Sequence, residues 1–179
     1  MRKLLALLFL MLTITCHAQH MKFLGIPIDG TINQFTQKLS TKGIKVHPNN
    51  ARDSGIDNRE FYGQFMNKQA EILVWFNPKT KIVHTVKVIL YGKSYEETKQ
   101  MYDDVSEVIK NKYNVQSTET GKLTDGTETY DYTIQNDSKK AIGWIILAKE
   151  NGYSGYWLSI FYRDAVNFEK DEASKYDDI

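Results

Sequence analysis

The chain has 179 residues, of which 41% are hydrophobic and 25% charged, with 23 Lys and Arg against 22 Asp and Glu. A chain of this length supports one compact core, so a single domain is expected. The near-neutral charge and the lack of a basic run argue against nucleic acid or an anionic membrane surface as a partner.

The first 18 residues have the three-part layout of a secretory signal peptide. Arg2 and Lys3 give a positive start, Leu4 to Leu12 form an apolar run, and a small and polar stretch ends at Ala18. The apolar run is much shorter than the roughly 20 residues that span a bilayer, so no transmembrane anchor is expected. Cleavage after Ala18 is predicted to release a periplasmic or secreted protein that begins at Gln19.

Cys16 offers a different interpretation, because a cysteine after a short apolar run can be the lipid-modified first residue of a bacterial lipoprotein. Lipoprotein signals carry a very small residue just before that cysteine and an aliphatic residue three positions before it. Thr15 and Thr13 occupy these positions here and favour plain secretion over lipidation. Cys16 is the chain's only cysteine, so a protein cleaved after Ala18 contains no disulfide.

The first elements after the signal are predicted to be a helix and a meander of strands. Thr31 and Gln34 form a capping-box pattern, apolar residues follow at spacings of three and four, and Gly43 ends the helix, which is expected from 32 to 42. An extended segment at 44–46 leads into a polar loop at 47–58. The strands are then predicted at 61–67, 71–77 and 82–91, antiparallel because their connections are short.

A second helix and a second set of strands follow in the same order. Ser94 and Glu97 form another capping-box pattern, and Met101, Val105 and Ile109 repeat at helical spacing, which predicts a helix over 95–112. Strands are predicted at 115–119, 128–135, 140–149 and 155–163. The charged segment 165–179 is expected to be a fraying helix or a disordered tail.

The repeated order of elements predicts an internal duplication within one domain at 19–164, with units at about 23–92 and 93–164. The ends of the two units also match locally, since Val88 to Tyr91 resembles Ser159 to Tyr162. The predicted fold class is α+β: one antiparallel sheet with helices packed on one face, built from two tandem α-β-β-β-β units.

This layout resembles the β-lactamase inhibitor protein fold, in which the unit occurs twice. With one unit, it resembles the small outer-membrane lipoprotein of the barrel-assembly machinery. The stretch from Gly25 to Thr31 is similar to the hydrophobic, Gly-containing segment that leads into those units. The resemblance implies a protein that presents a concave sheet face to a partner, and it implies no chemistry. The inhibitor family closes disulfides within its units, and a mature chain without cysteine departs from that pattern.

The sequence contains no pattern that predicts a catalytic, cofactor-binding or metal-binding residue. His20, His47 and His84 are not at metal-ligand spacing, and no nucleophile or phosphate-binding motif is found. His84 shares strand parity with Val86 and Val88, which places it in the core or on an apolar binding face. We favour a structural histidine with satisfied hydrogen bonds. No cofactor and no enzymatic activity are predicted.

Large apolar side chains occur on both faces of the last two predicted strands, although a sheet covered on one side needs only one apolar face. The excess is explained either by extra core beneath the tail or the long loop, or by a partner-binding face. Trp, Tyr and Arg dominate the energetics of interfaces. The candidate partner-binding residues are Trp75, Trp144, Trp157, Phe161, Tyr162 and Arg163.

These features favour a secreted or periplasmic module that binds another protein through an aromatic sheet face. Two alternatives stay open. A carrier would hold a small apolar ligand between the sheet and the helices, and an enclosed cavity would favour it. A hydrolase would use carboxylates that the sequence does not group, and a deep pocket with two carboxylates of raised pKa would favour it.

Overall fold

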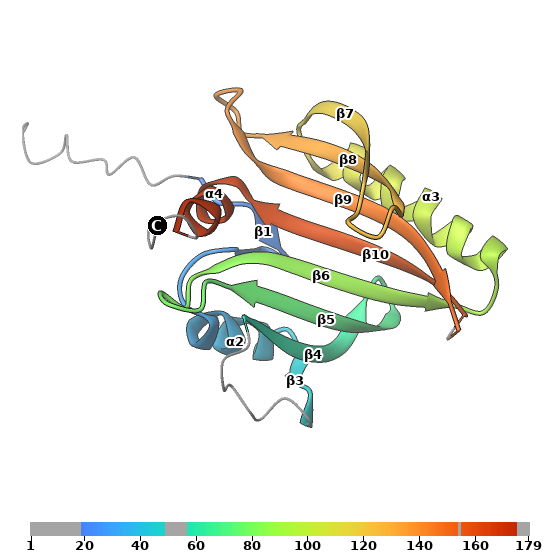
Figure 1. The fold of residues 1–179 in the computed structure, drawn as a ribbon, viewed down its shortest axis with the longest axis horizontal. Helices are drawn as coiled ribbons and strands as arrows, with labels where there is room; N and C mark the ends of the chain where they lie inside the picture. Colours follow the sequence, from blue (N-terminus) through green and yellow to red (C-terminus); the bar gives the residue numbers. More distant parts are fainter. Residues whose placement is uncertain (1–18, 49–56, 154, 175–179) are drawn as a thin grey trace, which may run out of the picture.

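The computed structural model describes residues 19–48, 57–153 and 155–174 (Figure 1). The predicted signal peptide, Cys16 and most of the predicted loop at 47–58 lie outside these ranges. The described chain is α+β, with one large antiparallel sheet, a small two-stranded sheet and three helices. The predicted α+β class with one large antiparallel sheet is therefore confirmed.

The large sheet has eight strands in the order β3-β4-β5-β6-β10-β9-β8-β7. At its centre β6 pairs antiparallel with β10, and on each side of this pair the strands follow in chain order. Two tandem units would produce this arrangement, although the duplication itself stays a prediction. The strands are β3 (Lys45–Val46), β4 (Asn58–Phe65), β5 (Lys68–Phe76), β6 (Val83–Gly92), β7 (Val115–Lys122), β8 (Glu128–Gln135), β9 (Ala141–Gly152) and β10 (Gly155–Asp164).

Two helices, α2 (Ile32–Ser40) and α3 (Tyr95–Lys112), cover one face of this sheet. Their apolar stripes and the alternate residues of the central strands form one core, because a strand turns every second side chain to the same face. The helix residues in this core are Ile32, Phe35, Leu39, Met101, Val105 and Ile109. The strand residues that they face include Ile72, Val74, Val86, Val88, Leu158 and Ile160.

The predicted capping box is complete at the start of α2 and present in part at the start of α3. The Thr31 side chain accepts a hydrogen bond from the Gln34 backbone N–H, and Gln34 Oε1 accepts one from the Thr31 N–H at 2.9 Å. Ser94 Oγ accepts from the Glu97 N–H at 3.2 Å, whereas the Glu97 carboxylate reaches the N–H of Lys93, one residue before the cap. These contacts satisfy backbone donors that an α-helix leaves unpaired at its start.

Two hairpin turns differ from the sequence prediction. Met66 and Asn67 both have positive φ and form a two-residue turn, so β4 ends at Phe65 and β5 begins at Lys68. The predicted turn at 67–69 was placed too late, because this turn type needs two left-handed residues and Met is an unusual choice. Leu24 and Gly25 make a similar turn between β1 (Lys22–Phe23) and β2 (Ile26–Pro27), a hairpin that was not predicted.

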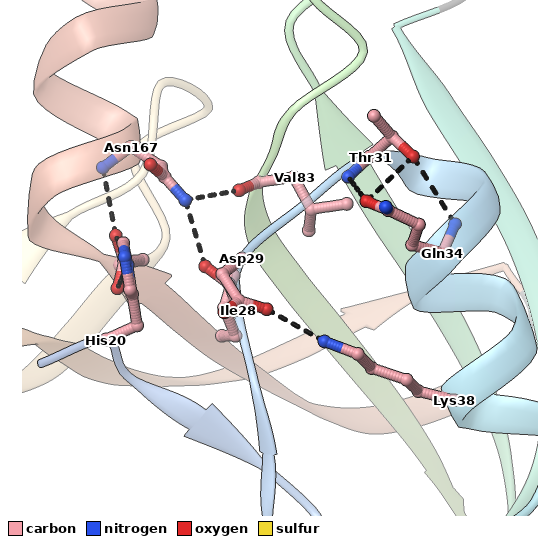
Figure 2. Close-up of polar contacts among 9 residues, drawn as sticks. His20, Ile28, Asp29, Thr31, Gln34, Lys38, Val83 and Asn167 are labelled. Carbon is pink, nitrogen blue, oxygen red and sulfur yellow. Dashed lines mark hydrogen bonds and ion pairs between the residues drawn. The ribbon is translucent and has the colours of Figure 1, made fainter. Parts of the chain in front are cut away.

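The C-terminal segment corrects another expectation, because residues 165–174 form a packed helix, α4 (Ala165–Ser174). Asp164, which is fully buried at the end of β10, accepts hydrogen bonds from the Asn167 N–H at 2.9 Å and the Met21 N–H at 2.8 Å, and it contacts the His20 ring at 3.1 Å. The Asn167 side chain donates to the carbonyl oxygens of Ile28 and Val83, each at 3.0 Å (Figure 2). Because charged residues are frequent in this segment, its sequence pattern does not predict that it packs as a helix.

None of the helices among residues 19–48, 57–153 and 155–174 is long and apolar enough to cross a membrane.

Replacing Asp164 with Ala should lower the free energy of unfolding by about 3 kcal/mol, because two buried backbone donors and the His20 ring would lose their acceptor. Urea unfolding followed by circular dichroism measures the change. Asp29→Ala is the matched control, since the Asp29–Lys38 ion pair is solvent-exposed and should contribute less than about 0.5 kcal/mol (Figure 2). Equal effects of the two variants would contradict the structural role of Asp164.

Candidate partner-binding face

We call the sheet face opposite α2 and α3 the outer face. Five of the six candidate residues lie on it: Trp75, Trp144, Trp157, Phe161 and Arg163. The strand register brings them together, since Arg163 lies between Thr85 on β6 and Trp144 on β9, and Trp75 on β5 lies opposite Thr85. All three tryptophans of the chain are therefore half-buried on one face of four adjacent strands.

Tyr162 does not belong to this surface, which corrects the predicted set. It is 5% exposed and lies in the core, where its ring packs against Phe23 at 5.3 Å between centroids. The physical reason is the alternation of side chains along a strand, which directs Tyr162 and its neighbours Phe161 and Arg163 to opposite faces. Burial raises the pKa of the Tyr162 hydroxyl.

Polar groups lie among the rings of the outer face. Lys87 Nζ is 5.0 Å from the centroid of Phe161 and 3.4 Å from Glu150 Oε1, so this lysine crosses β10 to reach β9. Tyr91 packs beside Trp157 at 6.4 Å, and its hydroxyl donates a hydrogen bond to Glu71 Oε2 at 2.9 Å. Partial burial raises the pKa of Tyr91, and Glu71 raises it further.

The α4 helix covers one end of the outer face. The Arg163 guanidinium lies 4.1 Å from the centroid of the Phe168 ring, which also meets the His84 ring at 5.9 Å. Burial lowers the pKa of Arg163, while Asp131 and Glu172 act in the opposite direction. At this end, Phe168 of α4 therefore covers part of the outer face.

The turn between β7 and β8 comes near the middle of the outer face. Figure 1 shows the β7–β8 connection crossing over β9. Hydrogen bonds from Thr127 lower the pKa of Asp125 in this turn, and the charge of Lys87 on β6 adds to the shift. The outer face is thus bounded by α4 at one end and by this turn on one side, while its β4–β6 half carries the exposed side chains of Glu60, Tyr62, Glu71 and Tyr91.

Three buried polar atoms on the outer face have no hydrogen-bond partner among the described residues. They are Asp131 Oδ1, Ser159 Oγ and Arg163 Nε, on the strands β8 and β10. A buried polar atom without a hydrogen bond costs free energy, which water or a partner that reaches it recovers. The outer face therefore combines aromatic rings with unsatisfied polar groups.

His84 does not share the face of Val86 and Val88, because the register shifts between Trp75 and Phe76 and places Val83 in the core instead. A bulge of this kind changes the side to which the next side chain points. His84 Nδ1 lies 3.0 Å from Thr85 Oγ1, and its Nε2 lies 3.8 Å from Asp171 Oδ2 on α4. These contacts agree with a structural histidine.

Sequence reasoning missed a pocket of about 320 Å³ between α4 and the β5–β6 connection. Aromatic and acidic side chains both line it, including those of Trp75, Phe168, Asp57, Asp171 and Glu172. Only the packing of α4 brings these residues together, and no sequence motif marks them. Within the described ranges, no group of three or more His, Cys, Asp and Glu side chains could hold a metal ion.

Comparison with family models, curated proteins and solved structures finds no match to this chain. The resemblance to the β-lactamase inhibitor protein fold accordingly stays a prediction.

The burial of Tyr162 predicts a change of stability with alkaline pH. An unfolded tyrosine ionises near pH 10, whereas the raised pKa keeps Tyr162 neutral in the folded protein, so its contribution to stability falls as pH rises above 10. Because Tyr162→Phe removes the ionisable hydroxyl, the free energy of unfolding of the variant should fall by about 1.4 kcal/mol less than that of the wild type between pH 9 and pH 11. Urea unfolding at pH 8, 9 and 11 measures both free energies. Their difference should be the same at pH 8 and pH 9, and the same difference at pH 11 would contradict the prediction.

Proposed function

We propose that this protein is a secreted or periplasmic interaction module that binds another protein through the outer face of its sheet. The observation that carries the proposal is the gathering of Trp75, Trp144, Trp157, Phe161 and Arg163 on the face opposite α2 and α3, of which α4 covers only the Arg163 end. Trp and Arg are the residue types in which binding energy concentrates at protein interfaces.

The polar chemistry of the outer face supports a protein as the partner. A protein surface offers backbone and side-chain hydrogen-bonding groups as well as apolar area, and interfaces combine an aromatic core with polar groups around it. The outer face has both components, because the Lys87–Glu150 ion pair lies beside Phe161 and the Tyr91–Glu71 hydrogen bond lies beside Trp157.

The proposed compartment rests on the sequence. The signal-peptide pattern of residues 1–18 supports export, and the near-neutral charge supports a partner that is recognised by shape and apolar contact. His20, the second residue after the predicted cleavage site, contacts the buried Asp164.

Affinity capture tests the proposal. Tagged protein of residues 19–179 is incubated with envelope and secreted fractions of its source, and bound proteins are identified by mass spectrometry. Trp157→Ala and Phe161→Ala should each reduce recovery of a reproducible partner at least about tenfold, which corresponds to a hot-spot contribution of ~1.4 kcal/mol or more.

Val108→Ala provides the matched control, because Val108 is an exposed apolar residue of α3 on the opposite side of the sheet. It should retain wild-type capture, and circular dichroism should show the same fold for all variants. Wild-type recovery by the two outer-face variants would exclude this face as the binding surface.

A further inference from the structure

Four exposed tyrosines meet at one end of the molecule. Tyr91 lies near the end of β6, Tyr95 begins α3, Tyr153 follows β9 in the β9–β10 hairpin, and Tyr156 lies near the start of β10. Figure 1 shows that these segments come together at the end of the sheet away from α4. Tyr153 is fully exposed, and the other three rings are 36–49% exposed. With Trp157 we call this group the aromatic rim.

The side chains of the aromatic rim lie on both faces of the sheet at the end of the β6–β10 pair. Tyr156 packs edge-on against Tyr95 at 6.1 Å, on the side of the sheet that α3 covers. Its neighbour Trp157 packs beside Tyr91 at 6.4 Å on the outer face. The rings therefore project from both faces and from the hairpin, so they form a protruding end instead of the wall of a groove.

We infer that the aromatic rim inserts into the headgroup region of a lipid bilayer. Tyrosine and tryptophan have an apolar ring and a polar group, and they concentrate at membrane–water interfaces where one part is buried in lipid and the other stays wet. Contiguous exposed apolar surface marks a site of protein or membrane contact. A fluid lipid surface can cover rings that point in several directions from a protruding end.

The charges around the aromatic rim indicate which lipid it fits. Lys93 and Lys149 are exposed near it, and so is Glu96, while Glu150 faces Lys87. Charges of both signs thus lie near the rim, and among the described residues they form no basic cluster that would attract anionic lipid. The aromatic rings would therefore provide the attraction to lipid, and a bilayer with electrically neutral headgroups suits the aromatic rim. This agrees with the absence of a basic run in the sequence.

Membrane contact at this end goes beyond the proposed binding function and would orient the protein. The aromatic rim and α4 lie at opposite ends of the central strands (Figure 1). A bilayer that holds the rim leaves Trp75, Trp144 and Arg163, which lie toward the α4 end, clear of the lipid.

Sedimentation with phosphatidylcholine vesicles tests the inference on protein of residues 19–179, because the apolar run of the signal would itself bind lipid. Wild-type protein should sediment with the vesicles, and its tryptophan emission should shift to shorter wavelength. Tyr153→Ala and Tyr156→Ala should each lower the partition coefficient about fivefold. Adding phosphatidylglycerol or raising the salt to about 0.5 M should change it less than about twofold.

Tyr62→Ala is the matched control, since Tyr62 is a tyrosine of similar exposure (39%) on β4, two strands from Tyr91 of the aromatic rim. It should sediment as the wild type does. Wild-type protein that stays in solution would overturn the inference and leave the rim as a surface for protein contact. An equal loss in Tyr62→Ala, or binding that salt abolishes, would also overturn it. Tyr153 and Tyr156 lie off the proposed binding face, and Phe161 lies outside the aromatic rim, so Phe161→Ala tests protein capture independently of vesicle binding.

Discussion

The pairing of β6 with β10 is the constraint on which both the core and the candidate binding face depend. It joins Thr85–Gly92 to Tyr156–Arg163, segments that are distant in the chain, along nearly their whole length. The register decides that Val86 and Tyr162 face α2 and α3, while Lys87 and Phe161 face outward. A slip of one residue would exchange these faces and expose the core, so the same hydrogen-bond ladder fixes the stability of the fold and the composition of its outer surface.

Asp164 connects the end of this central pair to both ends of the described chain. Burial of a carboxylate is costly unless hydrogen bonds compensate it, and here His20, the Met21 N–H and the Asn167 N–H supply them. The contact begins α4 and directs it onto the sheet, where Phe168 covers Arg163. The uncovered area of the outer face therefore depends on a polar cluster at the edge of the core.

The two proposed surfaces are continuous. Trp157 and Tyr91 belong both to the outer face and to the aromatic rim, so the aromatic surface extends from the middle strands to the end of the molecule. A module with this arrangement would hold a protein partner beside a bilayer. Phe161, which lies under Lys87 in the sheet, belongs to the outer face alone, and Tyr153 in the hairpin belongs to the rim alone.

The sequence by itself determined the features that depend on neighbouring residues. Capping patterns at Thr31 and Ser94 located α2 and α3, and alternating apolar residues identified most strands of the large sheet and the α+β class, because these signals act over a few residues. Only the tertiary structure decided what covers each face. The bulge beside His84, the burial of Tyr162 and the docking of α4 through Asp164 and Asn167 depend on register and on contacts between distant segments. The alternation of residues along a strand predicts which side chains share a face of the sheet, but it does not predict which face a helix will cover.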